Sequence, residues 1–146
     1  MHARKQAAPT ILRADSLASL PWLVHGFSTR VAGFSRSFGR NALNLGFTDK
    51  DSRTSVKRNR GIFLKEVGAT RDKQVWPLVT LRQIHSDLIH CVDRVPEATL
   101  VGDGLVTATP RLLLTVQTAD CLPVILIDAR HQTVDVLHAG WRGTVK

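Results

Sequence analysis

The second half of the chain consists of short apolar runs separated by turn residues, and this pattern constrains the fold more than any other feature. The runs LLLTV and PVILI are almost entirely apolar, so neither face of such a strand suits water. Strands of this kind need a covering layer on both sides, which predicts an α/β layered sandwich. Strands are expected after Trp76-Pro77, over residues 78–84, 87–92, 104–107, 112–118, 122–128 and 133–138.

The first half carries the helical signals. Apolar residues recur on one stripe of residues 51–67, namely Val56, Phe63 and Val67. Gly68 suits the end of this helix, and Asp49 or Asp51 is expected to cap its start. Residues 24–29 predict a short strand, and residues 30–46 a loop rich in Gly, Ser, Asn and Arg. There is no internal repeat or linker, so we expect one domain over residues 1–146.

The positive charge of the chain is confined to its first half. Residues 1–75 hold 14 Lys and Arg against 5 Asp and Glu, whereas residues 76–146 hold 6 against 7. Such a field attracts a phosphorylated small molecule, free phosphate or nucleic acid, and its alternative is a solvated basic face. Aromatic residues are few and do not interleave with the basic run, which disfavours nucleic acid. The cations are Arg30, Arg36, Arg40, Arg53, Lys57, Arg58 and Arg60.

Two further absences indicate a cytoplasmic protein. No apolar run approaches the roughly 20 residues of a membrane span, and the start of the chain lacks the apolar stretch of a secretory signal. The cysteines, Cys91 and Cys121, are too few to staple a domain, so we expect free thiols in a reducing compartment. No membrane partner is expected.

Three metal-binding side chains stand at the ends of predicted strands: His85 in QIHSD, Cys121 in TADCLPV and His138 in LHAGWRG. Two imidazoles and a thiolate suit Zn²⁺, and three protein ligands leave a fourth position for water or substrate. Copper accepts the same ligands, so ligand type leaves the metal open. The intervals between these residues are not those of a zinc finger. In the structural alternative, Cys121 is a small buried hydrophobic residue and the two histidines are hydrogen-bonded surface residues.

The same residues permit a different chemistry. Cys121 can act as a thiolate nucleophile with His138 or His85 as its base, as in a Cys-His hydrolase. Asp120 is a candidate to orient a histidine in either scheme, or else it caps a turn. Asp103 is a candidate acid/base or ribose-binding carboxylate, although Gly-Asp-Gly is also typical of a tight turn.

Several motifs together resemble the laccase-domain family, once named multicopper polyphenol oxidoreductases. They are QIHSD, GDGLVTATP, TADCLPVILID and HAGWRGT, with HGFSTRVAGFS, NALNLG and VKRNRGIFL upstream. The resemblance runs from about His25 to the last residue. It implies an αββα sandwich with mixed sheets and a zinc held by His85, Cys121 and His138.

The resemblance also implies an activity. Family members are described as phosphorylases that convert adenosine, inosine and methylthioadenosine, with phosphate, into the free base and a sugar 1-phosphate. They also deaminate adenosine, although the His-x-Glu and Cys-x-x-Cys pair of nucleobase deaminases is absent here. Alternatives within the family are an amidase acting on peptidoglycan precursors and a copper-dependent polyphenol oxidase, or laccase. The only Met, Met1, offers no axial ligand for a blue-copper centre.

Phosphorolysis requires a site that holds phosphate. The resemblance associates Asn44 and Arg60 with phosphate, and Arg30 and Arg142 are further candidates because Arg can contact phosphate oxygens bidentately. Family members continue for roughly another half-domain beyond GWRGT, so we expect a fold that is incomplete at its C-terminus. Its exposed strand edge would favour aggregation or pairing with a second copy of the chain, so we expect a fragment, a truncated product or an obligate oligomer.

Overall fold

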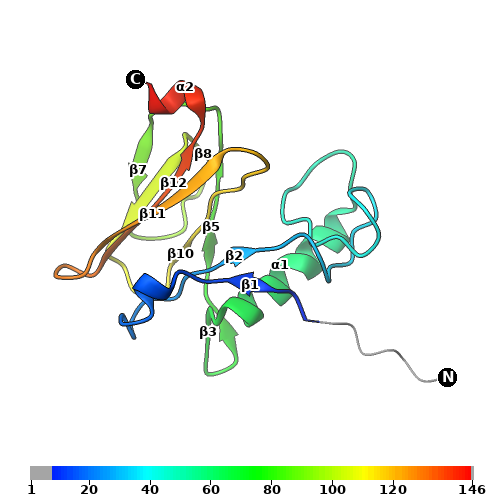
Figure 1. Ribbon diagram of the computed structural model, residues 1–146, viewed down its shortest axis with the longest axis horizontal. Helices are drawn as coiled ribbons and strands as arrows, with labels where there is room; N and C mark the ends of the chain where they lie inside the picture. Colours follow the sequence, from blue (N-terminus) through cyan, green and yellow to red (C-terminus); the bar gives the residue numbers. More distant parts are fainter. Residues whose placement is uncertain (1–7, 146) are drawn as a thin grey trace. The chain divides into compact units, whose positions relative to one another are not determined.

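The computed structural model describes residues 8–145 (Figure 1). Residues 1–7, the start of the segment searched for a secretory signal, and Lys146 lie outside that range. The chain divides into two compact units, residues 1–75 and 76–146, at the position where the charge balance changes. No helix within residues 8–145 is long and apolar enough to cross a bilayer. The domain over residues 1–146 stays a prediction.

Helix α1 (Arg53–Val67) is the main element of the first unit. It buries an apolar stripe that includes Val56, Phe63 and Val67, and it ends at Gly68, whose φ of 87° is left-handed, as predicted. The predicted cap is wrong. Ser52 is the N-cap and makes no side-chain cap bond. Asp51 does not cap the helix, because its carboxylate accepts hydrogen bonds from the Asn44 amide and the Ser52 N–H.

The other elements of the first unit are short. Strands β1 (Ile11–Leu12) and β2 (Phe27–Ser28) pair antiparallel, and the 3-10 helix η1 (Asp15–Leu17) lies between them in sequence. Strands β3 (Thr70–Arg71) and β4 (Gln74–Val75) form a hairpin. The segment over residues 30–46 is a loop, as expected, with isolated β-bridges between Ser35 and Ala42 and between Ser37 and Gly39.

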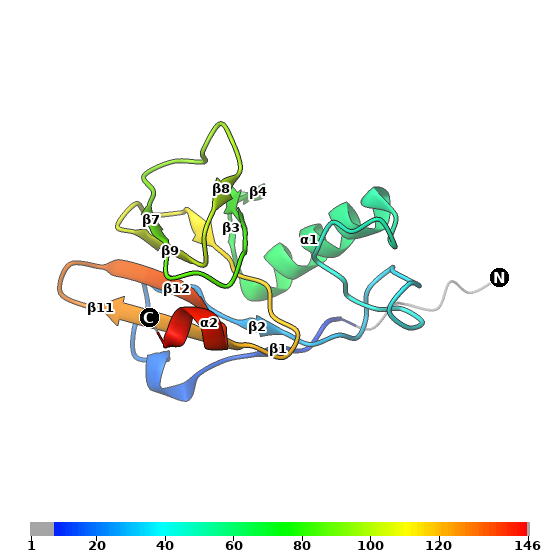
Figure 2. The ribbon, with the colours of Figure 1, turned by 90° about the horizontal axis from the view of Figure 1, so that it is seen from above.

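A four-stranded mixed sheet is the centre of the second unit (Figure 2). Its spatial order is β11 (Leu122–Asp128), β12 (Thr133–Ala139), β9 (Gly104–Thr107) and β7 (Ile89–Cys91). The first two neighbouring pairs are antiparallel, and β7 runs parallel to β9. The α/β class with mixed sheets is therefore confirmed.

Two small parallel pairs accompany this sheet. Strands β5 (Leu78–Val79) and β10 (Leu113–Leu114) form one, and β6 (Leu81–Arg82) and β8 (Leu100–Val101) form the other. The single strand predicted over residues 78–84 is wrong, because the chain passes from one pair to the other at Thr80. The core of this unit joins Val79, Val92, Leu105 and Val136.

Strand β11 differs from its prediction in burial. We expected PVILI to be covered on both faces, yet Leu126 is 50% exposed, and Leu122 and Ile125 are exposed as well. Within the described residues β11 pairs only with β12, so it is an edge strand with fewer neighbours than a central strand. Beyond β12, the short helix α2 (Trp141–Thr144) follows.

Candidate metal centre

Strand register brings the candidate ligands of the second unit together. Leu137 on β12 lies opposite Gly104 on β9, so the next residue, His138, lies beside Asp103, to whose carbonyl its N–H donates at 2.7 Å. Leu122 on β11 lies opposite Ala139, which places Cys121 at the same end of the sheet. His85 arrives from the loop after β6.

The three side chains form one cluster. One ligand atom from each of His85, Cys121 and His138 lies within 4.8 Å of the other two. The two imidazole rings meet edge to face, with centroids 4.8 Å apart. His138 is buried, Cys121 is half-buried and His85 is exposed, so the cluster has one open side. Three residues separated by intervals of 36 and 17 positions in the sequence thus share a single site.

Asp103 holds this cluster in place. Its carboxylate accepts the backbone N–H groups of Ile84, His85 and Ser86, and the Ser86 hydroxyl. It also lies 2.8 Å from Nδ1 of His138. Burial by itself raises the pKa of Asp103, but these hydrogen bonds, led by the Ser86 N–H and His138, outweigh it and hold the pKa well below its ordinary value. An ionised Asp103 therefore serves better to position groups than to donate a proton.

Asp103 is thus the carboxylate that hydrogen-bonds a histidine of the cluster, and the role expected for Asp120 stays a prediction. Asp120 hydrogen-bonds the Cys121 thiol, because adjacency in sequence brings it to that side chain. Burial raises the pKa of the Cys121 thiol, and the charge and hydrogen bond of Asp120 raise it further. The free thiol is therefore protonated at neutral pH, and a bound cation is the group that would deprotonate it.

Backbone conformation also shapes the cluster. His85 adopts a left-handed φ of 60°, which costs about 1–2 kcal/mol for a residue with a Cβ, and its N–H donates to Asp103 at 3.0 Å. Gly140 is buried beside it. A Cβ on Gly140 would lie 2.8 Å from Cδ2 of His85 and 3.6 Å from Sγ of Cys121, so the absent side chain makes room for the cluster.

The donor set fits a divalent metal. When Nδ1–H of His138 donates to Asp103, the lone pair of Nε2 is directed away and can ligate. Sulfur and nitrogen donors suit Zn²⁺ or copper. Three ligands from a cluster with one exposed member leave room for a fourth from solvent or substrate. Among residues 8–145 this is the only such His, Cys, Asp or Glu group.

The predicted phosphate ligands lie elsewhere in the chain. Asn44 and Arg60 belong to the first unit and make internal contacts: Asn44 donates to Asp51 and to the Gly46 carbonyl. Arg60 donates Nε–H to the Leu45 carbonyl and stacks on Phe47. Burial lowers the pKa of Arg60.

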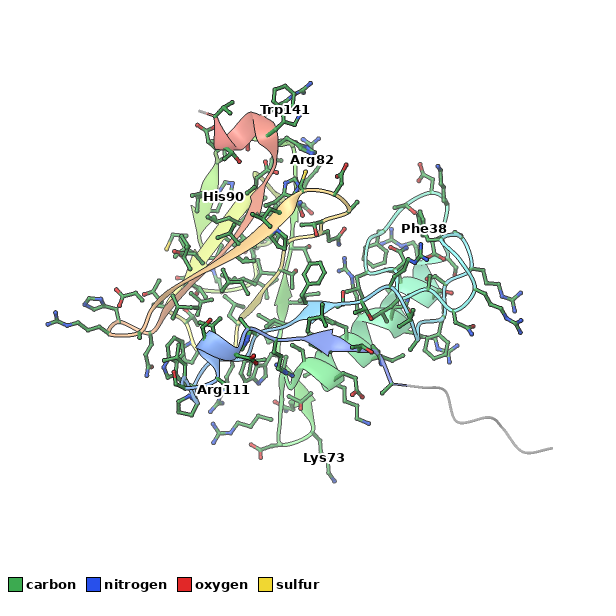
Figure 3. All side chains as sticks on the ribbon, in the orientation of Figure 1. Phe38, Lys73, Arg82, His90, Arg111 and Trp141 are labelled. Atoms are coloured by element: carbon green, nitrogen blue, oxygen red, sulfur yellow. The ribbon has the colours of Figure 1, made fainter. Side chains whose placement is uncertain are left out.

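The two remaining candidates, Arg30 and Arg142, are exposed. Arg30 is in the first unit, where its carbonyl accepts the Leu43 N–H. Arg142 lies on α2, directly after the cluster in sequence, with its guanidinium carbon 5.2 Å from the centre of the Trp141 ring. The Trp141 side chain extends outward from α2 in Figure 3 and is 70% exposed.

The sequence reasoning overlooked Ser86. This residue donates both its N–H and its hydroxyl to Asp103, and so it fixes the loop that carries His85. The signal lay in its position, directly after a predicted ligand in QIHSD. Serine has no strong chemical signature of its own, and only the fold places it against Asp103.

Comparison with known proteins identifies relatives. The family described as multi-copper polyphenol oxidoreductase laccase matches residues 24–146. A protein of Mycobacterium tuberculosis H37Rv named purine nucleoside phosphorylase is 39% identical over 118 residues, 80% of this chain and 45% of the relative. One of the same name from Deinococcus radiodurans is 36% identical over 92% of this chain and 49% of the relative. The chain thus spans about half the length of these relatives.

Two solved structures are similar to this fold. YlmD from Geobacillus stearothermophilus superposes with a TM-score of 0.77 at 31% identity, covering 96% of this chain and 53% of YlmD. The Neisseria meningitidis protein NMB0706 superposes with a TM-score of 0.68 at 36% identity, covering 81% of this chain and 46% of that one. The fold described above is therefore similar to theirs.

Proposed function

Because this chain belongs to the multi-copper polyphenol oxidoreductase laccase family, we propose that it carries the metal centre of a purine nucleoside phosphorylase. The observation that carries the proposal is the cluster of His85, Cys121 and His138 supported by Asp103. The name shared by relatives 36% and 39% identical supports the reaction class. Zn²⁺ is the proposed metal, since it accepts this donor set with an open position.

The proposed substrates are adenosine, inosine and methylthioadenosine, each with phosphate. A phosphate oxygen attacks the anomeric carbon of the sugar while the bond from that carbon to the purine nitrogen breaks. The bonding electron pair leaves with the purine, which takes up a proton, and the products are the free base and a sugar 1-phosphate. When bound, Zn²⁺ would polarise a ligand oxygen or lower the pKa of a water.

The residues of the chain have separate tasks in this scheme. Asp103 holds the ring of His138 and the backbone of His85 in place, so that the ligands are preorganised. The open side at His85 admits the substrate. Of the proposed phosphate contacts, Arg30 in the first unit and Arg142 in the second are exposed and have the free donors that this task requires. Asn44 and Arg60 would have to exchange their internal hydrogen bonds for a phosphate.

We extend the proposal to adenosine deamination, in which water replaces the exocyclic amine of the purine and ammonia leaves. Its proton transfers require a group other than the Glu of the nucleobase deaminases, because the His-x-Glu motif is absent. We place both activities in the cytoplasm, where a reducing environment keeps Cys121 a free thiol that can ligate.

Two other readings of the same residues are weaker. A Cys-His amidase needs a thiolate nucleophile, and the raised pKa of Cys121 disfavours the thiolate in the metal-free protein. A copper-dependent polyphenol oxidase shares the ligands of the cluster. A multicopper mechanism requires further copper sites, and residues 8–145 hold no second group of this kind.

The test combines metal analysis with an assay. Purified protein is expected to contain about one zinc per chain and to release hypoxanthine from inosine only when phosphate is present. Cys121→Ala and His138→Ala should each abolish zinc binding and turnover. His131→Ala is the matched control, because His131 is an exposed histidine that pairs with Asp128 at the β11–β12 turn. Full activity in a metal-free Cys121→Ala protein would contradict the proposal. So would the pattern of a Cys-His hydrolase, in which the unmodified enzyme stays active after chelation and alkylation of Cys121 abolishes that activity.

A further inference from the structure

The loop of the first unit contains a basic pocket. Arg36, Arg40 and Asn41 line it, and its volume is about 460 Å³, within the range of small-molecule sites. Both arginines are exposed, and neither is paired with a carboxylate in the described part of the chain. Two positive charges without a neutralising partner therefore face one hollow.

The backbone around this pocket is held by hydrogen bonds. The Gly33 N–H donates to the Asn41 carbonyl at 2.8 Å, and Ser35 and Ala42 exchange two backbone bonds of 3.0 Å. Asn41 turns the chain with a left-handed φ of 60°. Gly33 is required, because a Cβ there would lie 2.1 Å from the Ala42 carbonyl oxygen.

Asn59 of α1 fastens both sides of the loop. Its side chain is completely buried, accepts the Phe34 N–H at 2.7 Å and donates to the Ser35 hydroxyl at 2.9 Å. It donates as well to the Asn44 carbonyl at 2.8 Å. Because these contacts are internal to one unit and anchor the backbone on either side of residues 36–41, the pocket is formed before a ligand arrives. Figure 3 labels Phe38 on the same loop.

The pocket differs from the neighbouring phosphate candidate Asn44 in its free donors. An Asn amide has two N–H donors, and those of Asn44 are committed to Asp51 and Gly46. The ionised Asp51 beside Asn44 would also repel an anion, since its pKa lies below the ordinary value through hydrogen bonds from Asn44 and Ser35. Among residues 8–145, Arg36 and Arg40 form no ion pair with a carboxylate.

We propose that Arg36, Arg40 and Asn41 form a binding site for a phosphate group. Each planar guanidinium can donate two parallel N–H bonds to phosphate oxygens, and the Asn41 amide adds a neutral donor. Inorganic phosphate and the phosphate of a sugar 1-phosphate share this chemistry. That either one is a substrate or product rests on the proposed function, whereas anion binding by the pocket does not.

Calorimetric titration of the whole chain tests the site, with inorganic phosphate in one arm and ribose 1-phosphate in the other. Arg36→Gln/Arg40→Gln is expected to weaken the Kd for phosphate at least about tenfold, because charge-assisted hydrogen bonds are lost. Lys57→Gln/Lys65→Gln is the control. It removes two positive charges from exposed positions of α1 in the same unit, and the Kd should stay within about twofold.

A conservative variant tests the geometry of recognition. Arg36→Lys/Arg40→Lys keeps both charges but loses the bidentate donors, so its Kd should lie between those of the wild type and the Gln variant. Tighter binding of ribose 1-phosphate than of phosphate would identify the sugar phosphate as the ligand, and the reverse order would identify free phosphate. Far-UV circular dichroism confirms that each variant is folded.

Three results of the titrations would overturn the site: no binding of either anion to the wild type, an unchanged Kd in Arg36→Gln/Arg40→Gln, or equal weakening in both double variants. The last would show a diffuse field instead of a pocket. Single-stranded RNA bound through Arg36 and Arg40 without any affinity for phosphate would overturn it too. Phosphate binding without inosine turnover would sustain the site and contradict the proposed function. Inosine turnover with the same KM for phosphate in the wild type and in all variants would support the proposed function and contradict the site.

Discussion

The ring of His138 and the carboxylate of Asp103 form a buried pair, with Nδ1 2.8 Å from Oδ1 and side-chain exposures of 4% and 2%. The register of β12 against β9 creates this pair, because it sets residue 138 beside residue 103. A carboxylate that holds Nδ1–H of a histidine orients the ring and increases the basicity of Nε2. The pair is therefore the structural basis of the candidate metal centre.

Asp103→Asn should loosen the metal centre. The amide cannot accept every hydrogen bond that the carboxylate receives from Ser86, His85 and His138, so the ligands lose their orientation. We expect zinc affinity to fall by about 10–100-fold, as for other groups that support ligands, measured by competition with a chelator. Asp120→Asn is the control, with a smaller effect expected because Asp120 hydrogen-bonds the Cys121 thiol, whereas Asp103 holds both the His138 ring and the His85 backbone. Unchanged zinc affinity in folded Asp103→Asn would contradict this role.

Gly140→Ala should displace a ligand. The added methyl would lie 2.8 Å from Cδ2 of His85, and the exposed ring can move away without unfolding the sheet. Zinc affinity should therefore drop at least about tenfold while the Tm changes little. In the control Gly61→Ala, the methyl meets nothing within 4 Å. It should raise stability by about 0.5–1 kcal/mol through helix propensity, with no change in zinc binding; equal zinc affinity in the two variants would contradict the prediction.

Asp51 should make the stability of the first unit depend on pH. Hydrogen bonds from Asn44 and Ser35 hold its pKa below the ordinary value near 3.8, so the folded state binds its proton less tightly than the unfolded state. The contribution is fully present above pH about 4 and disappears as the pH falls through the lowered pKa. Asp51→Ala should thus lower the Tm at pH 7 and have less effect at pH 3. A Tm difference that is the same at both pH values would exclude the mechanism.

Asp135 should destabilise β12 at neutral pH. One of its carboxylate oxygens is buried without a partner, between Val106 and Leu126 in the register, and burial raises its pKa. The charged form is therefore disfavoured in the folded state above the ordinary pKa, and its cost diminishes as the pH falls. Asp135→Thr should raise the Tm by about 2–4 °C at pH 7, with a smaller gain near pH 4.

Asp128→Thr is the matched control for that experiment. Asp128 accepts hydrogen bonds from Arg130 and His131 at the β11–β12 turn, so its replacement should lower the Tm at pH 7. A decrease in Tm for Asp135→Thr as well would mean that its carboxylate contributes to stability.

Sequence patterns predicted local structure well where one interaction decides it. Residues 104–107 and 122–128 are strands with the predicted bounds, because β-branched and apolar runs end at turn residues. Gly68 ends α1 because only a residue tolerant of positive φ suits that position. The start of α1 was mispredicted because Asp51 has a competing partner, Asn44, that lies seven residues away.

The candidate metal ligands could also be named from the sequence, but the residues that hold them in place could not. From the sequence, Asp103 was a candidate acid/base or ribose-binding carboxylate or a turn residue, whereas Asp120, beside Cys121, was the candidate to orient a histidine. Ser86 was overlooked because serine has no strong chemical signature of its own. Each of these assignments depends on contacts between segments 17 to 35 residues apart.

The sequence by itself determined the α/β class, the family, the basic first half and which three side chains are the candidate metal ligands, because these follow from residue types and their order. Only the tertiary structure decided that Asp103 orients His138, that Gly140 makes room for His85, and that Arg36 and Arg40 keep free donors while Asn44 does not. The physical reason is that hydrogen-bond donors and acceptors are satisfied by whichever groups strand register and loop closure bring within about 3 Å, and those distances are not local properties of the chain.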